Sequence, residues 1–144
     1  MKINPISSDQ LQELFELYDE YNRPRDQHPD IEEANNILAQ IRRQDAEIFV
    51  AVDPSILGTY MIHICHNLTR SGRPYAIVEN VICKSTIRRS GVGRQLMEHA
   101  IEYAQSKGCY KLALQTGIAR TENHQFYEAC GLASDKRAYQ IRFK

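Results

Sequence analysis

The sequence has no excess of charge of either sign, which limits the partners that it can attract. Lysine plus arginine and aspartate plus glutamate each total 18, so the formal net charge at pH 7 is zero. Without a positive surplus, no overall field draws the chain to nucleic acid or to an anionic membrane. We therefore expect neither of these partners, and any site for an anion has to be formed locally.

Long apolar runs and paired cysteines are also missing. No run approaches the roughly 18 apolar residues of a membrane-spanning helix, and the N-terminus MKINPISSDQ lacks the apolar core of a secretory signal.

The cysteines are Cys65, Cys83, Cys109 and Cys130, which lie far apart without C-x-x-C spacing, so buried free thiols are favoured over disulfides or a zinc site. Strand alternation would send His63 and His66 to opposite faces, so no metal site is expected. These absences predict a cytoplasmic protein.

The rest of the composition is that of an ordinary globular domain. Of the 144 residues, 42% are hydrophobic and 25% are charged. No repeat, low-complexity tract or linker interrupts the chain, so we expect residues 1–144 to form a single domain with a sizeable core.

Apolar residues recur at helical spacing in four segments. Helices are expected at residues 7–24 and 30–44, in a stripe over residues 96–104, and at residues 121–131. Asp30 is the expected N-cap of the second helix, and Pro24, Gly108 and Gly131 end the first, third and fourth. Branched and aromatic residues or clean alternation predict strands at residues 2–6, 47–52, 56–66, 75–83, 110–116 and 138–143. The pattern is that of an α/β domain.

The letters RRSGVG, at residues 88–93, stand between the fourth strand and the third helix. A helix start leaves about four backbone N–H groups unpaired and carries roughly half a positive charge, so it attracts phosphate. Gly91 and Gly93 allow positive φ and close approach, while Arg88, Arg89 and Arg94 add charge. The segment predicts a diphosphate site, although a simple turn with solvated arginines is the alternative. A Walker loop has no match here, and Leu96 stands where a Rossmann fingerprint needs its third glycine.

Glu79 interrupts the apolar strand YAIVENVIC, where Ile77 and Val81 are expected to share its face. Desolvation would raise the pKa of this carboxylate toward neutrality, as a general base requires. The alternative is a carboxylate on a solvated face or in an ion pair with an arginine.

Three motifs together resemble the GNAT acetyltransferase superfamily. R-x-x-G-x-G, at Arg88, Gly91 and Gly93, resembles its coenzyme A pyrophosphate loop; YAIVENVIC resembles its fourth strand; and HQFYEACGL resembles its late F-Y-x-x-x-G segment. The likeness extends from about residue 46 to residue 143. It implies an α/β, GNAT-like fold with a mixed, mostly antiparallel sheet of six to seven strands and about four helices. It also implies that acetyl-CoA is the cosubstrate and that no metal takes part.

The resemblance also implies roles for individual residues. Main-chain groups at Val81, Ile82 and Cys83 would hold the pantetheine arm. The pyrophosphate would bind at Arg88, Arg89, Ser90, Gly91, Val92, Gly93 and Arg94, with Asn123 and Phe126 as further cofactor contacts. Many members carry asparagine where this chain has Arg120, which leaves the role of Asn123 open.

Acid and base roles follow from the same resemblance. Glu79 would accept the proton of the attacking amine, directly or through water, and Tyr127 would supply a proton to the leaving thiolate. The alternative for Tyr127 is a core aromatic packed beside Phe126.

The acceptor is expected to be a primary amine of a small polar molecule. Candidate acceptor contacts are Tyr21, Arg70, Arg73 and Tyr75, and the two arginines suit either an acidic acceptor or plain solvation. A protein or peptide N-acetyltransferase, a non-catalytic acyl-CoA sensor and an unrelated nucleotide-binding module are the alternatives. The alternating segment 138–143 predicts a homodimer formed by exposing or exchanging an edge strand.

Overall fold

The computed structural model describes residues 1–21 and 27–144. Its strands are β1 (Lys2–Pro5), β2 (Ala46–Val52), β3 (Ile56–Cys65), β4 (Tyr75–Cys83) and β5 (Leu112–Leu114). Its α-helices are α1 (Leu11–Asp19), α2 (Ile31–Arg43), α3 (Val92–Ser106) and α4 (Thr121–Ala129). The five strands form one sheet in the order β1-β2-β3-β4-β5, antiparallel except where β4 pairs with β5 in parallel. The expected mixed, mostly antiparallel α/β sheet with four helices is confirmed.

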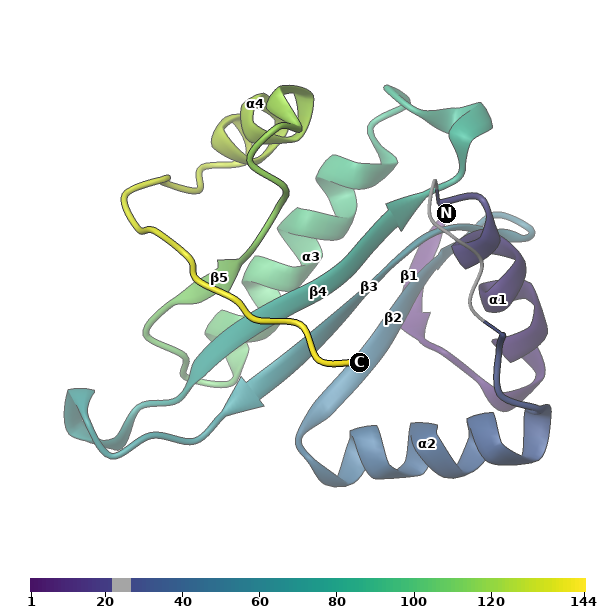
Figure 1. Ribbon diagram of the computed structural model, residues 1–144, viewed down its shortest axis with the longest axis horizontal. Helices are drawn as coiled ribbons and strands as arrows, with labels where there is room; N and C mark the ends of the chain where they lie inside the picture. Colours follow the sequence, from purple (N-terminus) through teal and green to yellow (C-terminus); the bar gives the residue numbers. More distant parts are fainter. Residues whose placement is uncertain (22–26) are drawn as a thin grey trace.

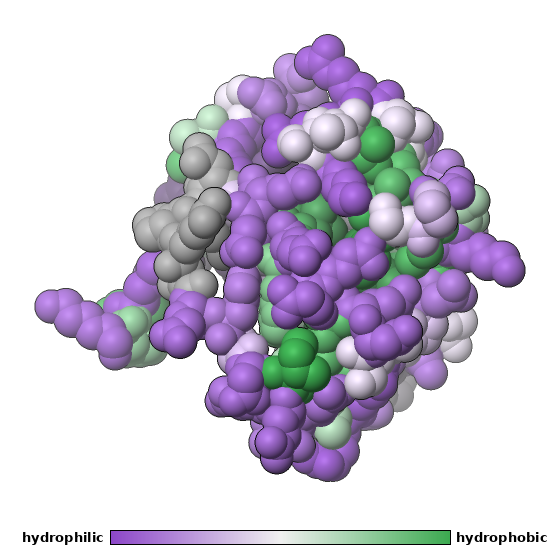
Figure 2. All heavy atoms as spheres, turned by 90° about the vertical axis from the view of Figure 1, so that its right-hand side faces the viewer, coloured by the Kyte–Doolittle hydropathy of each residue, from purple (hydrophilic) through white to green (hydrophobic). Residues whose placement is uncertain are grey.

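Helices cover both faces of this sheet (Figure 1), with α1 and α2 on one face and α3 on the other. Alternation along β2 separates the two cores: Phe49 and Ala51 pack in the cluster that contains α3, whereas Ile48 and Val50 pack with α1 and α2. On the α1–α2 side the outer surface is mostly hydrophilic and shows apolar side chains only in patches (Figure 2).

Local signals fix the helix starts. The carboxylate of Asp30 accepts a hydrogen bond from the Glu33 N–H at 2.8 Å, which confirms the expected N-cap of α2. At the first helix, the Ser7 N–H donates to the Gln10 side chain at 2.9 Å, a 3₁₀ turn follows, and α1 begins at Leu11. The expected stop at Pro24 lies outside the described residues. Of the helices in the described part, none is long and apolar enough to cross a membrane.

The expectation of six to seven strands is wrong. Residues 138–143 form no strand; residues 133–144 adopt neither helix nor strand and are exposed throughout. The strand expected at residues 110–116 is reduced to Leu112–Leu114. Alternation states which face each residue would occupy, but a strand also needs a neighbouring edge with which to exchange backbone hydrogen bonds. The segment 138–143 has no such neighbour among the described residues of its own chain.

Candidate active site

The two parallel strands separate at one end of the sheet, and this separation creates a free edge. Val78 and Leu114 are the last paired residues, yet β4 continues to Cys83. Residues 79–83 therefore have no strand partner on that side within the described chain, a length of about 17 Å at roughly 3.3 Å per residue. Val81, Ile82 and Cys83, the expected pantetheine contacts, all lie on this edge, where an extended ligand can pair with main-chain groups.

A β-bulge in β4 decides where Glu79 points. Glu79 pairs with Met61 and Ile82 pairs with Thr59, so two residues of β4, one of them Asn80 at φ 55°, oppose a single residue of β3. After the bulge, Val81 packs in the α3 cluster.

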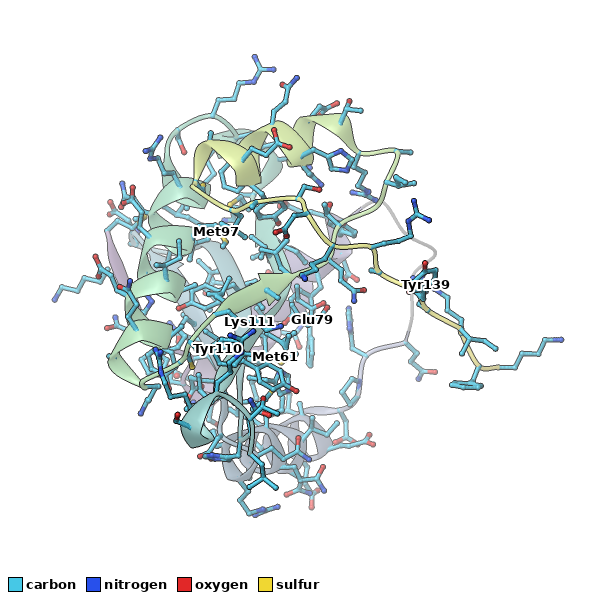
Figure 3. The ribbon with its side chains drawn as sticks, turned by 90° about the vertical axis from the view of Figure 1, so that its left-hand side faces the viewer. Met61, Glu79, Met97, Tyr110, Lys111 and Tyr139 are labelled. Atoms are coloured by element: carbon cyan, nitrogen blue, oxygen red, sulfur yellow. The ribbon has the colours of Figure 1, made fainter. Side chains whose placement is uncertain are left out.

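The expectation that Glu79 shares a buried face with Val81 is therefore wrong, because the bulge puts their side chains on opposite sides of the sheet. Glu79 is exposed. It pairs with Met61 of β3, and Figure 3 shows both residues on the side of the sheet away from α3. The carboxylate is therefore open to solvent and accessible to an acceptor.

The start of α3 forms a cradle, residues 88–94, beyond the end of the free edge. Gly91 is the N-cap with φ 90°, no side chain caps the helix, and the first turn closes with the Gln95 N–H donating to the Gly91 carbonyl at 3.1 Å. The preceding amides, from Val92 to Arg94, belong to the unpaired first turn of a helix. A β-carbon on Gly91 would have no atom within 4 Å, so open space lies in front of these amides. On Gly93 it would lie 3.2 Å from the Phe126 ring, so α4 packs closely against the cradle.

The arginines of the cradle are exposed, as is Ser90. Burial raises the pKa of the Cys83 thiol, and the Arg88 guanidinium opposes that rise, which places Arg88 near the end of the free edge. Arg89 adopts φ 65° within the turn. Arg94 instead forms an exposed ion pair with Glu98 at 3.1 Å, so its charge is shared with a carboxylate one helical turn away.

Tyr127 lies on α4 and faces the same end of β4. Burial raises its pKa to about 12, and Tyr21, Cys83 and Cys130 add to the rise. Its ring meets the Phe126 ring edge to face, with centroids 5.1 Å apart. The phenol therefore stays protonated at neutral pH and can donate a hydrogen bond.

Tyr21, just after α1, and Arg120, just before α4, lie against each other. The Arg120 guanidinium carbon lies 5.0 Å from the centroid of the Tyr21 ring. Tyr21 also contributes to the raised pKa of Tyr127. Glu20, beside Tyr21, accepts a hydrogen bond from the Ser85 N–H at 3.1 Å, which ties the end of α1 to the turn before the cradle. Sequence reasoning selected Tyr21 but missed Arg120 as a site residue; its departure from asparagine was the available signal.

Asn123 has a structural partner. Its amide nitrogen donates to the Thr116 hydroxyl at 3.3 Å, and the His124 Nε2 lies 2.9 Å from the Gly117 carbonyl. Both contacts hold the loop between β5 and α4.

Three of the residues expected to bind the acceptor, Arg70, Arg73 and Tyr75, lie away from Glu79 and Tyr127. Arg73 donates to the carbonyls of Gly108 and Cys109 at 3.3 and 3.1 Å, so it binds the chain at the end of α3. Arg70 lies over the Tyr110 ring at 5.3 Å. Tyr75 is four residues before Glu79 along β4, about 13 Å away in an extended strand. Of the four residues expected to contact the acceptor, only Tyr21 thus influences Tyr127. Arg70 and Arg73 instead contact Tyr110 and the end of α3.

Metal ligands do not gather at this site. Across residues 1–21 and 27–144, no three histidine, cysteine or acidic side chains are grouped so that they could hold a metal ion.

The chain resembles several known proteins. It is 30% identical to glucosamine 6-phosphate N-acetyltransferase of Trypanosoma brucei brucei over 60% of this chain and 56% of that protein. It is 31% identical to aminoglycoside N(6')-acetyltransferase type 1 of Serratia marcescens over 48% of this chain and 47% of that protein. The chain thus matches about half the length of these curated relatives.

A solved structure covers the chain more completely. A protein from Agrobacterium tumefaciens str. C58 assigned as an acetyltransferase superposes with a TM-score of 0.91 at 37% identity, over 99% of this chain and 100% of that one. The model of the Acetyltransferase (GNAT) family matches residues 11–132, which include the free edge, the cradle and Tyr127. The chain therefore belongs to the Acetyltransferase (GNAT) family.

Proposed function

We propose that this chain is a single catalytic domain, residues 1–144, that transfers an acetyl group from acetyl-CoA to a primary amine of a small polar molecule. The observation that carries the proposal is the continuity of the free edge of β4 with the uncapped start of α3, with Tyr127 beside them. An extended ligand with a diphosphate at one end fits this geometry.

The described residues fit the donor. The main chain of residues 81–83 would pair with the amides of the pantetheine arm, as an added strand does. The first-turn amides of α3, with Arg88 and Arg89, would bind the diphosphate. Acetyl-CoA supplies the acetyl group as a thioester.

Two side chains of the protein would transfer protons during the reaction, one from the amine and one to the sulfur. An alkylamine with a pKa near 10.4 is protonated at neutral pH, and removing its proton costs roughly 4 kcal/mol at about 1.36 kcal/mol per pH unit. The exposed carboxylate of Glu79 would take this proton, directly or through water. Tyr127, whose pKa is raised to about 12, keeps its own proton and would give it to the departing sulfur.

Transfer proceeds directly between the two bound partners in this proposal. Burial raises the pKa of both nearby thiols, Cys83 and Cys130, so they stay protonated and are poor nucleophiles. Holding the amine in line with the carbonyl then supplies most of the acceleration.

The names of the relatives narrow the class of acceptor molecule that we propose. Their names identify amino sugars as substrates, either phosphorylated or within an aminoglycoside. We propose an amino sugar as the acceptor, with the Arg120 guanidinium, stacked on Tyr21, facing its polar groups. The protein would act without a metal, as a homodimer in the cytoplasm.

Calorimetry tests donor binding. Acetyl-CoA is expected to bind, whereas ATP and NAD, which lack pantetheine, should bind weakly or not at all. Preference for either nucleotide would overturn the proposal.

An acetyl-transfer screen tests the reaction, with thiol release measured over polyamines, amino acids, aminoglycosides and hexosamine phosphates. Amino sugars should give the highest kcat/KM. Tight binding of acetyl-CoA without turnover on any amine would identify a sensor instead, and turnover only on peptides would identify a protein acetyltransferase.

A further inference from the structure

Gly58 lies in the interior of β3, where glycine is unfavourable because it loses backbone entropy and offers no side chain to pack. It is buried, and it pairs with Ala51 of β2 on one side and with Cys83 of β4 on the other. A glycine at such a place often marks the close approach of another segment of the chain. Here both β4 and α3 come that close.

A β-carbon added at Gly58 would press against both of these elements. It would lie 2.9 Å from the Leu96 Cδ1 of α3. It would also lie 3.1 Å from the Ile82 carbonyl oxygen and 3.2 Å from the Cys83 Sγ, both in β4. The carbonyl oxygen belongs to the main chain and cannot rotate away as a side chain can. A side chain at position 58 would therefore displace the Ile82 carbonyl by a few tenths of an ångström.

The packing around Gly58 leaves this displacement little other outlet. Leu96 is fully buried, and the Cys83 Sγ also lies 3.6 Å from the place of a β-carbon on Gly93, at the start of α3. Close-packed interiors transmit such a strain instead of absorbing it. We therefore expect an added methyl group at Gly58 to move the main chain of β4.

The main-chain groups at the end of β4 alternate between β3 and the free edge. Just after the strand, the Lys84 N–H donates to the Leu57 carbonyl of β3 at 2.9 Å. Successive residues of a strand direct their main-chain groups to opposite sides. Ile82 therefore directs its N–H and C=O toward β3, as Lys84 directs its N–H, whereas Cys83 directs its own groups toward the free edge.

A single peptide plane links these two directions. The C=O of Ile82 and the N–H of Cys83 belong to the same planar trans peptide and point in opposite directions. A displacement of the Ile82 carbonyl therefore also tilts the Cys83 N–H, which is the donor that the free edge offers to an extended ligand.

We propose that Gly58 is a positioning residue for donor binding. Because it carries no side chain, the Ile82–Cys83 peptide can lie at the angle at which the Cys83 N–H pairs with the pantetheine arm. Gly58 acts through β4 and not by touching the ligand, since it lies on the β3 side of that strand. The inference rests on the proposed function, because it takes acetyl-CoA as the ligand of the free edge.

Calorimetry on Gly58→Ala tests the inference. The Kd for acetyl-CoA should rise about tenfold, as expected when one main-chain hydrogen bond is misaligned. The Kd for the adenosine diphosphate part of CoA, which lacks pantetheine, should stay unchanged, because that part binds at the cradle. Gly117→Ala is the matched control, since its β-carbon would meet its first contacts at 3.5 Å, an ordinary separation, and it should bind acetyl-CoA like the parent.

The outcomes separate this inference from the proposed function. A parent that does not bind acetyl-CoA would defeat both. A parent that binds it, with an unchanged Kd in Gly58→Ala, would defeat the inference alone. Equal losses for acetyl-CoA and for its adenosine diphosphate part would also overturn the inference, because they would indicate a general loss of structure.

Hydrogen exchange of the unmodified chain, followed by NMR, covers the case in which Gly58→Ala does not fold. In the free protein, the Ile82 amide, which faces β3, should exchange slowly and the Cys83 amide rapidly. Addition of acetyl-CoA should slow exchange at Cys83 and leave Ile82 unchanged. A Cys83 amide that is already protected without ligand would show that this peptide does not face the free edge, and the inference would be wrong.

Discussion

At the scale of single residues, Tyr127 is the proton donor that we propose. Burial and the neighbouring phenol of Tyr21 favour its neutral form, and Cys83 at the end of β4 lies near it. Sequence patterns selected this tyrosine through the letters F-Y, but no sequence pattern states that two phenols from α4 and the end of α1 converge. That proximity arises only when the N-terminal helix packs over the sheet.

We expect Tyr127→Phe to lower kcat by about 10²-fold or more while the Kd for acetyl-CoA stays nearly unchanged, because only the proton donor is lost. Steady-state kinetics and calorimetry measure the two quantities. Tyr103→Phe is the matched control, since Tyr103 packs against Phe49 away from the cradle. Equal turnover of parent and Tyr127→Phe would remove this residue from the mechanism.

The exposure of Glu79 was predicted wrongly from the strand pattern. A glutamate inside an apolar strand was expected to be buried. Because of the bulge at Asn80, its side chain instead lies on the solvent-exposed side of the sheet. A bulge adds one residue to one strand and changes which residues share a face, and the alternating letters of a single strand do not reveal it.

For Glu79→Gln we predict a fall in kcat/KM for the amine of about 10²-fold, with acetyl-CoA binding retained, because the amide accepts no proton at neutral pH. Glu16→Gln, an exposed change on α1, is the control. The loss should shrink at high pH, where the free amine is already abundant. A loss that is constant between about pH 7 and pH 10, close to the pKa of the amine, would argue against a base role.

At the scale of elements, the two ends of α3 share a backbone feature but differ in their surroundings. Both ends carry a glycine in the left-handed region: Gly91 at φ 90° and Gly108 at φ 78°, each with open space where a β-carbon would point. Sequence analysis identified both positions, because a glycine beside a helical stripe is a strong local signal. The free edge of β4 leads to Gly91 and not to Gly108, so the proposed cofactor site lies at the N-terminal end of α3.

This symmetry provides a matched pair of variants. Gly91→Trp should abolish acetyl-CoA binding in calorimetry, because the indole fills the space in front of the first-turn amides. Gly108→Trp imposes similar left-handed strain, roughly 1–2 kcal/mol for a residue with a side chain, and should bind acetyl-CoA like the parent. If both variants lose binding equally, backbone strain and not the cradle is responsible.

At the scale of the whole molecule, a half-buried polar pair joins the sheet to α3. The Tyr60 hydroxyl and the His99 Nδ1 lie 2.6 Å apart, and Phe49 contacts both rings. Burial lowers the pKa of His99, with Glu102 opposing the change, and burial raises the pKa of Tyr60. The folded state therefore holds both groups neutral.

The stability of the protein should depend on pH through this pair. In the unfolded chain histidine titrates near about pH 6.5, so below that pH the unfolded state binds the proton first and the free energy of unfolding falls. Urea denaturation at about pH 7.5 and about pH 5, on either side of that value, should show a larger loss for the parent than for His99→Gln, which cannot titrate. Equal losses would mean that His99 is not held neutral by folding.

The sequence alone determined the α/β class, the positions of the helices and the first four strands, and the family, because caps, periodicity and the glycine turn are local signals. Tertiary structure decided three things that no local signal encodes: the exposure of Glu79, the packing of Arg120 on Tyr21, and the failure of residues 138–143 to join their own sheet. Each depends on a neighbour distant in sequence, and a strand without a neighbour is only a pattern of alternating residues.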